Sequence, residues 1–89
     1  MSGAGFTCLV PAFNEADRIA AVLAAVVGHP MLAGVIVIDD GSSDGTGRVA
    51  RECGARVIRT PGNLGKTGAL LLGLREVSTS HVVLIDADL

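Results

Sequence analysis

The chain has 89 residues, a net charge of −2 and a pI of about 5.5. Hydrophobic residues make up 49% of it, enough for a buried core, but aromatic residues make up only 2%. Without a basic track or stacking platforms, the composition argues against a nucleic-acid partner. The longest apolar run, residues 20–27, is far shorter than the roughly 20 residues that cross a membrane. We therefore expect no transmembrane segment, no signal peptide and a cytoplasmic location.

Strand and helix patterns alternate along the chain. They predict strands at residues 6–10, 35–38, 56–59 and 81–85, and helices at residues 15–27, 45–53 and 66–77. Pro11 is expected to close the first strand. Asn14 is expected to cap the first helix with Asp17 as its capping-box partner, and Ser43 or Asp44 to cap the second.

The third predicted helix carries its large apolar residues at helical spacing. The expected buried face consists of Leu70, Leu71, Leu74 and Val77. Cys8 and Cys53 belong to no metal or redox motif, so we expect both to be reduced, buried thiols.

This order, βαβαβαβ, predicts an α/β fold: a three-layer, Rossmann-like, mostly parallel sheet. About 90 residues is short for an α/β enzyme, because domains most often have roughly 100–150. The sequence also stops directly after the fourth predicted strand. We expect residues 1–89 to form a single domain that is truncated at its C-terminus.

Four polar clusters follow the predicted strands. They lie at residues 11–15, 39–42, 65–66 and 86–88. All carboxyl ends of a parallel sheet meet at one edge, where α/β proteins bind ligands. The clusters are therefore expected to converge on one site.

Asp39 and Asp40 end a strand of four β-branched residues, and several explanations are open for them. An Asx-turn explains them structurally, and a phospho-acceptor of a receiver-like domain is a functional alternative. An EF-hand calcium loop starting at Asp40 requires Glu at its twelfth position. Arg51 stands there instead, which argues against calcium.

Residues 60–67 read TPGNLGKT between a predicted strand and a predicted helix. A P-loop requires Gly at the position of Thr60, and the strand at residues 82–86 is similar to a Walker-B strand. The motif follows the third strand, however, and leaves Asp40 and Glu15 unexplained. A P-loop NTPase is therefore only a second alternative. Independently of it, a lysine at a helix N-terminus after a Gly-rich loop is well placed to contact a phosphate, and we expect this of Lys66.

Asp86 and Asp88 are two residues apart on an extended segment, so their carboxylates point to the same side. Two hard oxygen ligands in this arrangement suit Mg²⁺ or Mn²⁺ bridging a substrate diphosphate.

Four motifs together resemble the N-terminal half of a family-2 glycosyltransferase with the GT-A fold. They are LVPAFNE at 9–15, VIDDGSSDGT at 37–46, GNLGK at 62–66 and LIDADL at 84–89. The last motif is most similar to polyprenyl-phosphate (dolichyl-phosphate type) mannosyl- and glucosyltransferases, with glucosyl-3-phosphoglycerate synthases as close relatives.

The resemblance implies a nucleotide-sugar donor, a UDP- or GDP-sugar, and a role for each matched residue. The base and ribose would lie against Pro11, Ala12, Phe13 and Glu15, with Asp40 accepting a hydrogen bond from the base edge, and Ser42 would be a further donor-binding residue. Lys66 would meet the diphosphate, Asp86 would lie near the ribose and the metal, and Asp88 would bind the Mg²⁺ or Mn²⁺.

The implied reaction is attack of an acceptor oxygen on the anomeric carbon, with a nucleoside diphosphate leaving. The acceptor would be a polyprenyl phosphate or a small molecule, and a lipid acceptor would place the protein at the cytoplasmic face of a membrane. The general base of such enzymes lies beyond the Asp-x-Asp motif, so we assign no catalytic base. An inactive truncated fragment is the non-enzymatic alternative.

Overall fold

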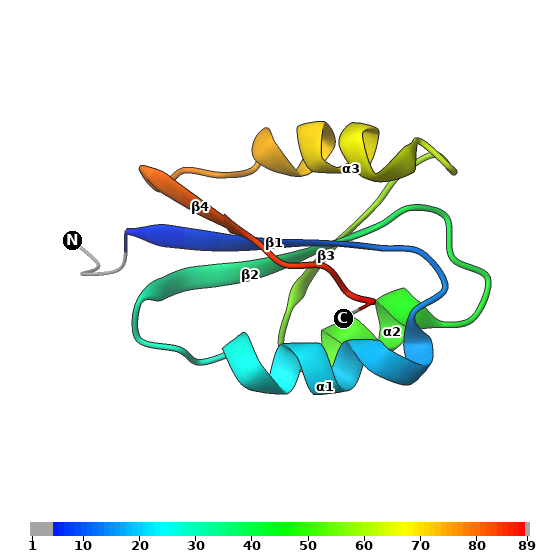
Figure 1. The fold of residues 1–89 in the computed structure, drawn as a ribbon, viewed down its shortest axis with the longest axis horizontal. Helices are drawn as coiled ribbons and strands as arrows, with labels where there is room; N and C mark the ends of the chain where they lie inside the picture. Colours follow the sequence, from blue (N-terminus) through cyan, green and yellow to red (C-terminus); the bar gives the residue numbers. More distant parts are fainter. Residues whose placement is uncertain (1–4, 89) are drawn as a thin grey trace.

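The computed structural model describes residues 5–88 (Figure 1). The strands are β1 (Phe6–Ala12), β2 (Leu32–Asp39), β3 (Arg56–Arg59) and β4 (His81–Leu84), and the helices are α1 (Ala16–Val26), α2 (Thr46–Glu52) and α3 (Gly65–Leu74). Within this part of the chain the order of elements is the predicted one.

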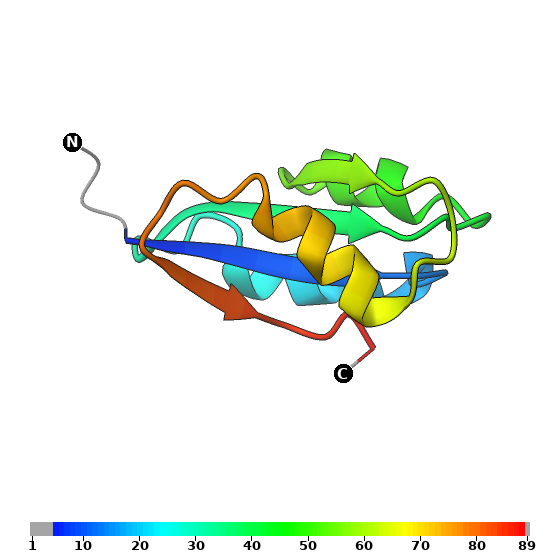
Figure 2. The same cartoon turned by 90° about the horizontal axis from the view of Figure 1, so that it is seen from above.

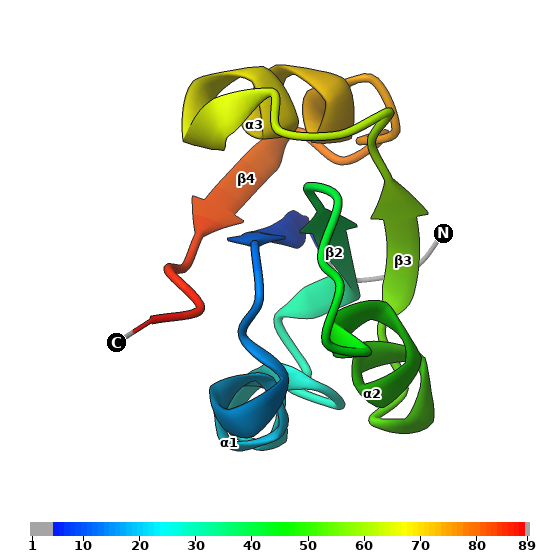
Figure 3. The same ribbon diagram turned by 90° about the vertical axis from the view of Figure 1, so that its right-hand side faces the viewer.

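The four strands form one parallel sheet in the order β3-β2-β1-β4. Figure 3 shows three layers: α3 covers one face of the sheet, and α1 and α2 cover the other. Seen from above, α3 crosses over the central strands (Figure 2). The predicted α/β, Rossmann-like architecture is confirmed.

The central strands alternate their side chains between two cores, as a pleated strand must. Cys8, Val10 and Val37 face α1 and α2, where they pack with the fully buried Ile19 and Leu23. On the other face, the buried side chains that pack with α3 are Leu9, Ile36, Ile38 and Ala69. With both faces covered, β1 and β2 are almost continuously apolar.

Strand β1 runs further than predicted. Pro11 does not close it but pairs in register with Ile38, and Ala12 pairs with Asp39. The pairing of β1 with β4 ends at Leu9, so at Pro11 the strand has one neighbour. A residue without an N–H is tolerated there, because only one side of the strand must be hydrogen-bonded.

The predicted buried face of α3 was only half right: Leu70 and Val77 are partly buried and pack against the core, but Leu71 and Leu74 do not. Leu71 and Leu74 are 61% and 45% exposed, whereas Ala69 and Gly73 are fully or almost fully buried. A Cβ at Gly73 would lie only 2.8 Å from Cδ1 of Ile38. The helix thus approaches the sheet through small residues, and a larger side chain at these positions would push it away.

The capping predictions also need correction. Asn14 has a left-handed backbone (φ 54°), which Asn tolerates better than most residues, and the N-cap of α1 is Glu15. The N-cap of α2 is Gly45, although Asp44 Oδ1 accepts the amide of Thr46 at 3.1 Å. The two loops therefore use their polar side chains differently from simple caps.

The two cysteines differ in their surroundings. Cys8 is fully buried, and its burial raises the pKa of the thiol, whereas Cys53 is only partly buried. The expected burial of Cys53 was thus too strong. Over residues 5–88, no helix has the length and apolar character needed to cross a membrane.

We predict that Gly73→Val destabilises the protein by about 1–3 kcal/mol, because the added side chain overpacks the contact of α3 with Ile38 and Leu9. Gly34→Val is the matched control, since a Cβ at Gly34 meets no atom within 4 Å. Urea unfolding of both variants measures the difference. Equal stabilities would contradict the close approach of α3.

Candidate functional site

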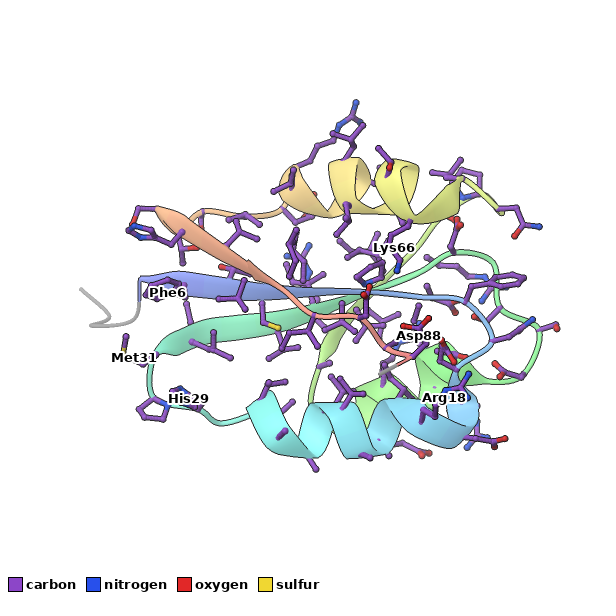
Figure 4. All side chains as sticks on the ribbon, in the orientation of Figure 1. Phe6, Arg18, His29, Met31, Lys66 and Asp88 are labelled. Carbon is purple, nitrogen blue, oxygen red and sulfur yellow. The ribbon has the colours of Figure 1, made fainter. Side chains whose placement is uncertain are left out.

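A cavity of about 380 Å³ lies at the edge of the sheet where the strands end. Its lining residues are Pro11, Ala12, Phe13, Glu15, Asp40, Asn63, Gly65, Lys66, Ala69, Asp86, Ala87 and Asp88. Lys66 and Asp88 lie toward this end in Figure 4, and Phe6, His29 and Met31 toward the opposite end. There a second cavity, of about 310 Å³, is lined almost entirely by apolar side chains. Polar chemistry is thus concentrated at the first cavity.

Asp39 shapes the turn that follows β2. Its side chain is 2% exposed, and Oδ1 accepts the amide of Ser42 at 2.9 Å. Oδ2 accepts Nη1 of Arg59 at 2.8 Å, and Nη2 of the same guanidinium donates to the carbonyl of Ser42 at 2.9 Å. A buried carboxylate needs such partners, and here they fix the turn.

Asp40 holds the loop between β3 and α3. Oδ1 accepts the Thr60 hydroxyl at 2.6 Å and the Leu64 amide at 2.8 Å, and Oδ2 accepts the Gly65 amide at 2.8 Å. Burial of Asp40 disfavours its charged form, but these three hydrogen bonds outweigh that effect and lower the pKa of the carboxyl. Asp40 is therefore an ionised carboxylate at the cavity wall.

The loops after β1 and β2 are bonded to each other. The Asn14 amide donates to Oγ of Ser42 at 2.8 Å, and Asn14 Oδ1 accepts the Ser43 amide at 2.9 Å. The Glu15 amide donates to Oγ1 of Thr46 at 3.0 Å. These bonds hold residues 12–15 against the second loop, so that the cavity wall is formed jointly by both.

Glu15 is nearly buried at the cavity wall and is paired with Arg18. Arg18 Nε donates to Oε1 of Glu15 at 3.0 Å, and this hydrogen bond is the main reason why the pKa of Arg18 is raised. Figure 4 shows Arg18 near Asp88. No sequence motif pointed to Arg18, although its position three residues after Glu15 on a helix is the ordinary spacing of an ion pair.

Lys66 Nζ lies 2.7 Å from Oδ1 of Asp86, and the hydrogen bond with this carboxylate raises the pKa of the lysine. Asp86 and Asp88 both line the cavity. Over residues 5–88, no group of three or more His, Cys, Asp or Glu side chains gathers as a metal cage. Two carboxylates still fit Mg²⁺ or Mn²⁺, which commonly complete their coordination with water and substrate phosphates.

The structure brings together eight of the nine predicted site residues, which are Pro11, Ala12, Phe13, Glu15, Asp40, Lys66, Asp86 and Asp88. Ser42 lies outside the lining, because its hydroxyl is buried against the Asn14 amide. Gly65 and Ala87 of the lining belong to the predicted clusters, but sequence reasoning missed Asn63 and Ala69. For Asn63 the available signal was its place between two glycines of a loop, where its backbone proves to be left-handed (φ 43°).

The P-loop alternative does not fit this geometry. A P-loop offers free backbone amides to phosphate, but here the amides of Leu64 and Gly65 donate to Asp40. Instead, several carboxylates and one lysine line a cavity at the carboxyl ends of the strands of a Rossmann-like sheet. This arrangement is typical of nucleotide-binding α/β proteins.

The chain belongs to the family described as glycosyl transferase family 2, whose model matches residues 7–89. A similar relative is the 4,4'-diaponeurosporenoate glycosyltransferase of Staphylococcus aureus strain USA300. It is 38% identical in an alignment of 87 positions that covers 92% of this chain and 23% of the relative. The chain thus spans about a quarter of that relative's length.

Solved structures agree with this membership. The glucosyl-3-phosphoglycerate synthase of Mycobacterium tuberculosis, in complex with Mn²⁺, UDP and glucosyl-3-phosphoglycerate, has a TM-score of 0.82 and 33% identity, covering 96% of this chain and 34% of that one. The mannosyl-3-phosphoglycerate synthase of Rubrobacter xylanophilus has a TM-score of 0.86 and 27% identity, covering 97% and 31%. The described fold is therefore the N-terminal part of a GT-A fold.

We predict that Arg59→Met destabilises the protein by about 1–2 kcal/mol, because it removes the charged partner of the buried Asp39 carboxylate. The expected loss of stability is small because the Arg59 side chain is itself 57% exposed, and solvent weakens the ion pair. Arg48→Met is the control, since Arg48 pairs with Glu52 on an exposed helix face. Thermal unfolding compares them, and equal melting temperatures would contradict the role of Arg59.

Proposed function

We propose that the cavity binds the donor of a glycosyl transfer, a nucleotide-diphosphate sugar. The observation that carries the proposal is that Lys66, Asp86, Asp88, Asp40 and Glu15 all line one cavity, in which Lys66 Nζ lies 2.7 Å from Asp86 Oδ1. A diphosphate needs a cation, a bound metal needs carboxylates, and a base and a ribose need acceptors.

The base and ribose occupy the side of the cavity formed by the loops after β1 and β2. The backbone of Pro11, Ala12 and Phe13 lies along this wall, and Phe13 is 47% exposed. Asp40 accepts a hydrogen bond from the base edge and Glu15 accepts one from a ribose hydroxyl. Ser42 supports the base side indirectly, by holding the Asn14 amide.

The diphosphate occupies the other side, beside Lys66. Asp88, assisted by Asp86, holds a divalent cation, Mg²⁺ or Mn²⁺, which when bound supplies Lewis-acid charge to the leaving diphosphate. Because Lys66 is paired with Asp86 in the free chain, donor binding requires the lysine to exchange a carboxylate for a phosphate oxygen. Its charge then stabilises the negative charge that grows on the diphosphate as the bond between the anomeric carbon and the diphosphate oxygen breaks.

For the acceptor, we propose a polyprenyl phosphate, as the final motif suggests, and a small acidic molecule as the second candidate. Among similar proteins, those named after 3-phosphoglycerate support the second candidate, whereas another is named after 4,4'-diaponeurosporenoate, a carotenoid acid. An acceptor oxygen attacks the anomeric carbon as the nucleoside diphosphate leaves. With a polyprenyl phosphate, the reaction takes place at the cytoplasmic face of a membrane.

A calorimetric titration of the chain with UDP-glucose and GDP-mannose, with and without Mn²⁺, tests donor binding. We predict metal-dependent binding of at least one donor. Asp88→Ala should lose the metal dependence and Asp40→Ala should weaken binding about tenfold, as expected when one hydrogen bond to a charged group is lost.

Asp17→Ala is the control, because Asp17 is exposed on α1 and does not line the cavity. A cooperative melt that nucleotide shifts upward would support a competent binding module. Tight ATP binding that Asp40→Ala leaves unchanged would favour the P-loop alternative. Absence of both donor binding and a melting transition would identify an inactive fragment.

A further inference from the structure

Helix α3 takes its N-terminal acceptor from another element. Its own N-cap residue, Leu64, offers no side-chain hydrogen bond, and its first turn contains no acidic residue. Asp40, at the end of β2, accepts the amides of Leu64 and Gly65 instead, each at 2.8 Å. The first amides of a helix need acceptors, and negative charge is favourable at this end. A carboxylate 24 residues earlier in the chain thus caps the helix.

The rest of the loop is also tied to the end of β2. The Asn63 amide donates to the Asp40 carbonyl at 3.2 Å, and the Thr60 hydroxyl donates to Asp40 Oδ1 at 2.6 Å. A Cβ at Gly41 would lie 3.0 Å from the Cα of Gly62, so the two loops are in backbone contact. Residues 60–65 have little freedom to move independently of Asp40.

The last residue held in this way, Gly65, directly precedes Lys66. The lysine reaches the cavity from the first turn of α3, where its Nζ meets Asp86. The position of Asp40 therefore sets where the backbone of Lys66 begins. A shift of the loop would therefore move the Lys66 ammonium group, even if the side-chain conformation of the lysine did not change.

Among residues 5–88, nothing occupies one acceptor position of Asp40. A carboxylate accepts about four hydrogen bonds, and three are accounted for, two on Oδ1 and one on Oδ2. Asp40 lines the cavity although it is only 6% exposed. The remaining position on Oδ2 can accept an N–H from a ligand without breaking the bonds to the loop.

We propose that Asp40 is the positioning residue for Lys66, so that one carboxylate joins recognition of the base to the contact with the diphosphate. The proposal rests on the proposed donor site and adds a second role to a residue assigned there to the base. Its consequence is specific: loss of the Asp40 carboxylate weakens binding of a diphosphate that carries no base at all.

Binding of pyrophosphate in the presence of Mn²⁺, measured by calorimetry on the 89-residue chain, tests this coupling. We expect Asp40→Asn and Lys66→Ala each to lower pyrophosphate affinity about tenfold, and the double variant to lose little more than either single variant. The shared loss arises because Asn has one acceptor oxygen instead of two: with that oxygen on Thr60 and Leu64, its NH2 group faces the Gly65 amide and cannot accept from it, so the loop releases Lys66.

Thr60→Val provides a milder variant for the case in which Asp40→Asn does not fold. It removes the hydroxyl bonded to Asp40 Oδ1 but leaves the carboxylate itself in place. We expect an approximately threefold loss of pyrophosphate affinity with an unchanged preference for UDP over ADP. Asp44→Asn is the matched control, because Asp44 is a turn carboxylate that bonds Ala16 and Thr46 and lies outside the cavity lining.

Three results would overturn the inference. In the first, Asp40→Asn binds pyrophosphate like the parent chain and loses only the preference for UDP, which leaves Asp40 a reader of the base alone. In the second, the losses at Asp40 and Lys66 multiply in the double variant, so Asp40 does not act through the lysine. In the third, Thr60→Val binds pyrophosphate like the parent chain. Failure of the parent chain to bind either UDP or pyrophosphate would instead refute the donor site, and the inference with it.

Discussion

Two buried carboxylates at the end of one central strand organise the whole ligand edge. Asp39 and Asp40 are 1% and 6% exposed, and a buried charge is tolerated only when its oxygens are hydrogen-bonded. Asp39 meets this requirement through Arg59 and the turn after β2. Asp40 meets it through the loop that leads to α3. Satisfying the charges thus fixes the two loops that form much of the cavity wall.

The free site is balanced by its own ion pairs. Lys66 is paired with Asp86, and Arg18 with Glu15, so two of the carboxylates that line the cavity are neutralised by cations of the chain itself. In the donor site that we propose, a diphosphate together with a divalent cation would replace the Lys66–Asp86 pair by two new ion pairs. Binding would then exchange partners rather than create charge in an apolar pocket, which would keep its desolvation cost low.

Much of the fold and most of the site could be predicted from the sequence, because both follow from local patterns. Alternating apolar runs gave the order of elements, and polar residues at strand ends met at one edge, as parallel strands require. The buried face of α3 could be predicted only in part: Leu70 and Val77 pack against the core, but Leu71 and Leu74 are exposed. Periodicity assigns large side chains to the core, whereas the close approach of this helix selects Ala69 and Gly73. The contacts of Asp40 with Leu64 and Gly65 were also hidden, since they join positions more than 20 residues apart.

A crystal structure of the chain with UDP and Mn²⁺ bound would show directly whether this edge holds a donor. We predict Mn²⁺ on Asp88, the Lys66 ammonium moved from Asp86 to the diphosphate, and the Leu64 and Gly65 amides still on Asp40. A nucleotide bound elsewhere on the molecule, or one bound here while the Lys66–Asp86 pair stays intact and the metal avoids Asp88, would contradict the donor site.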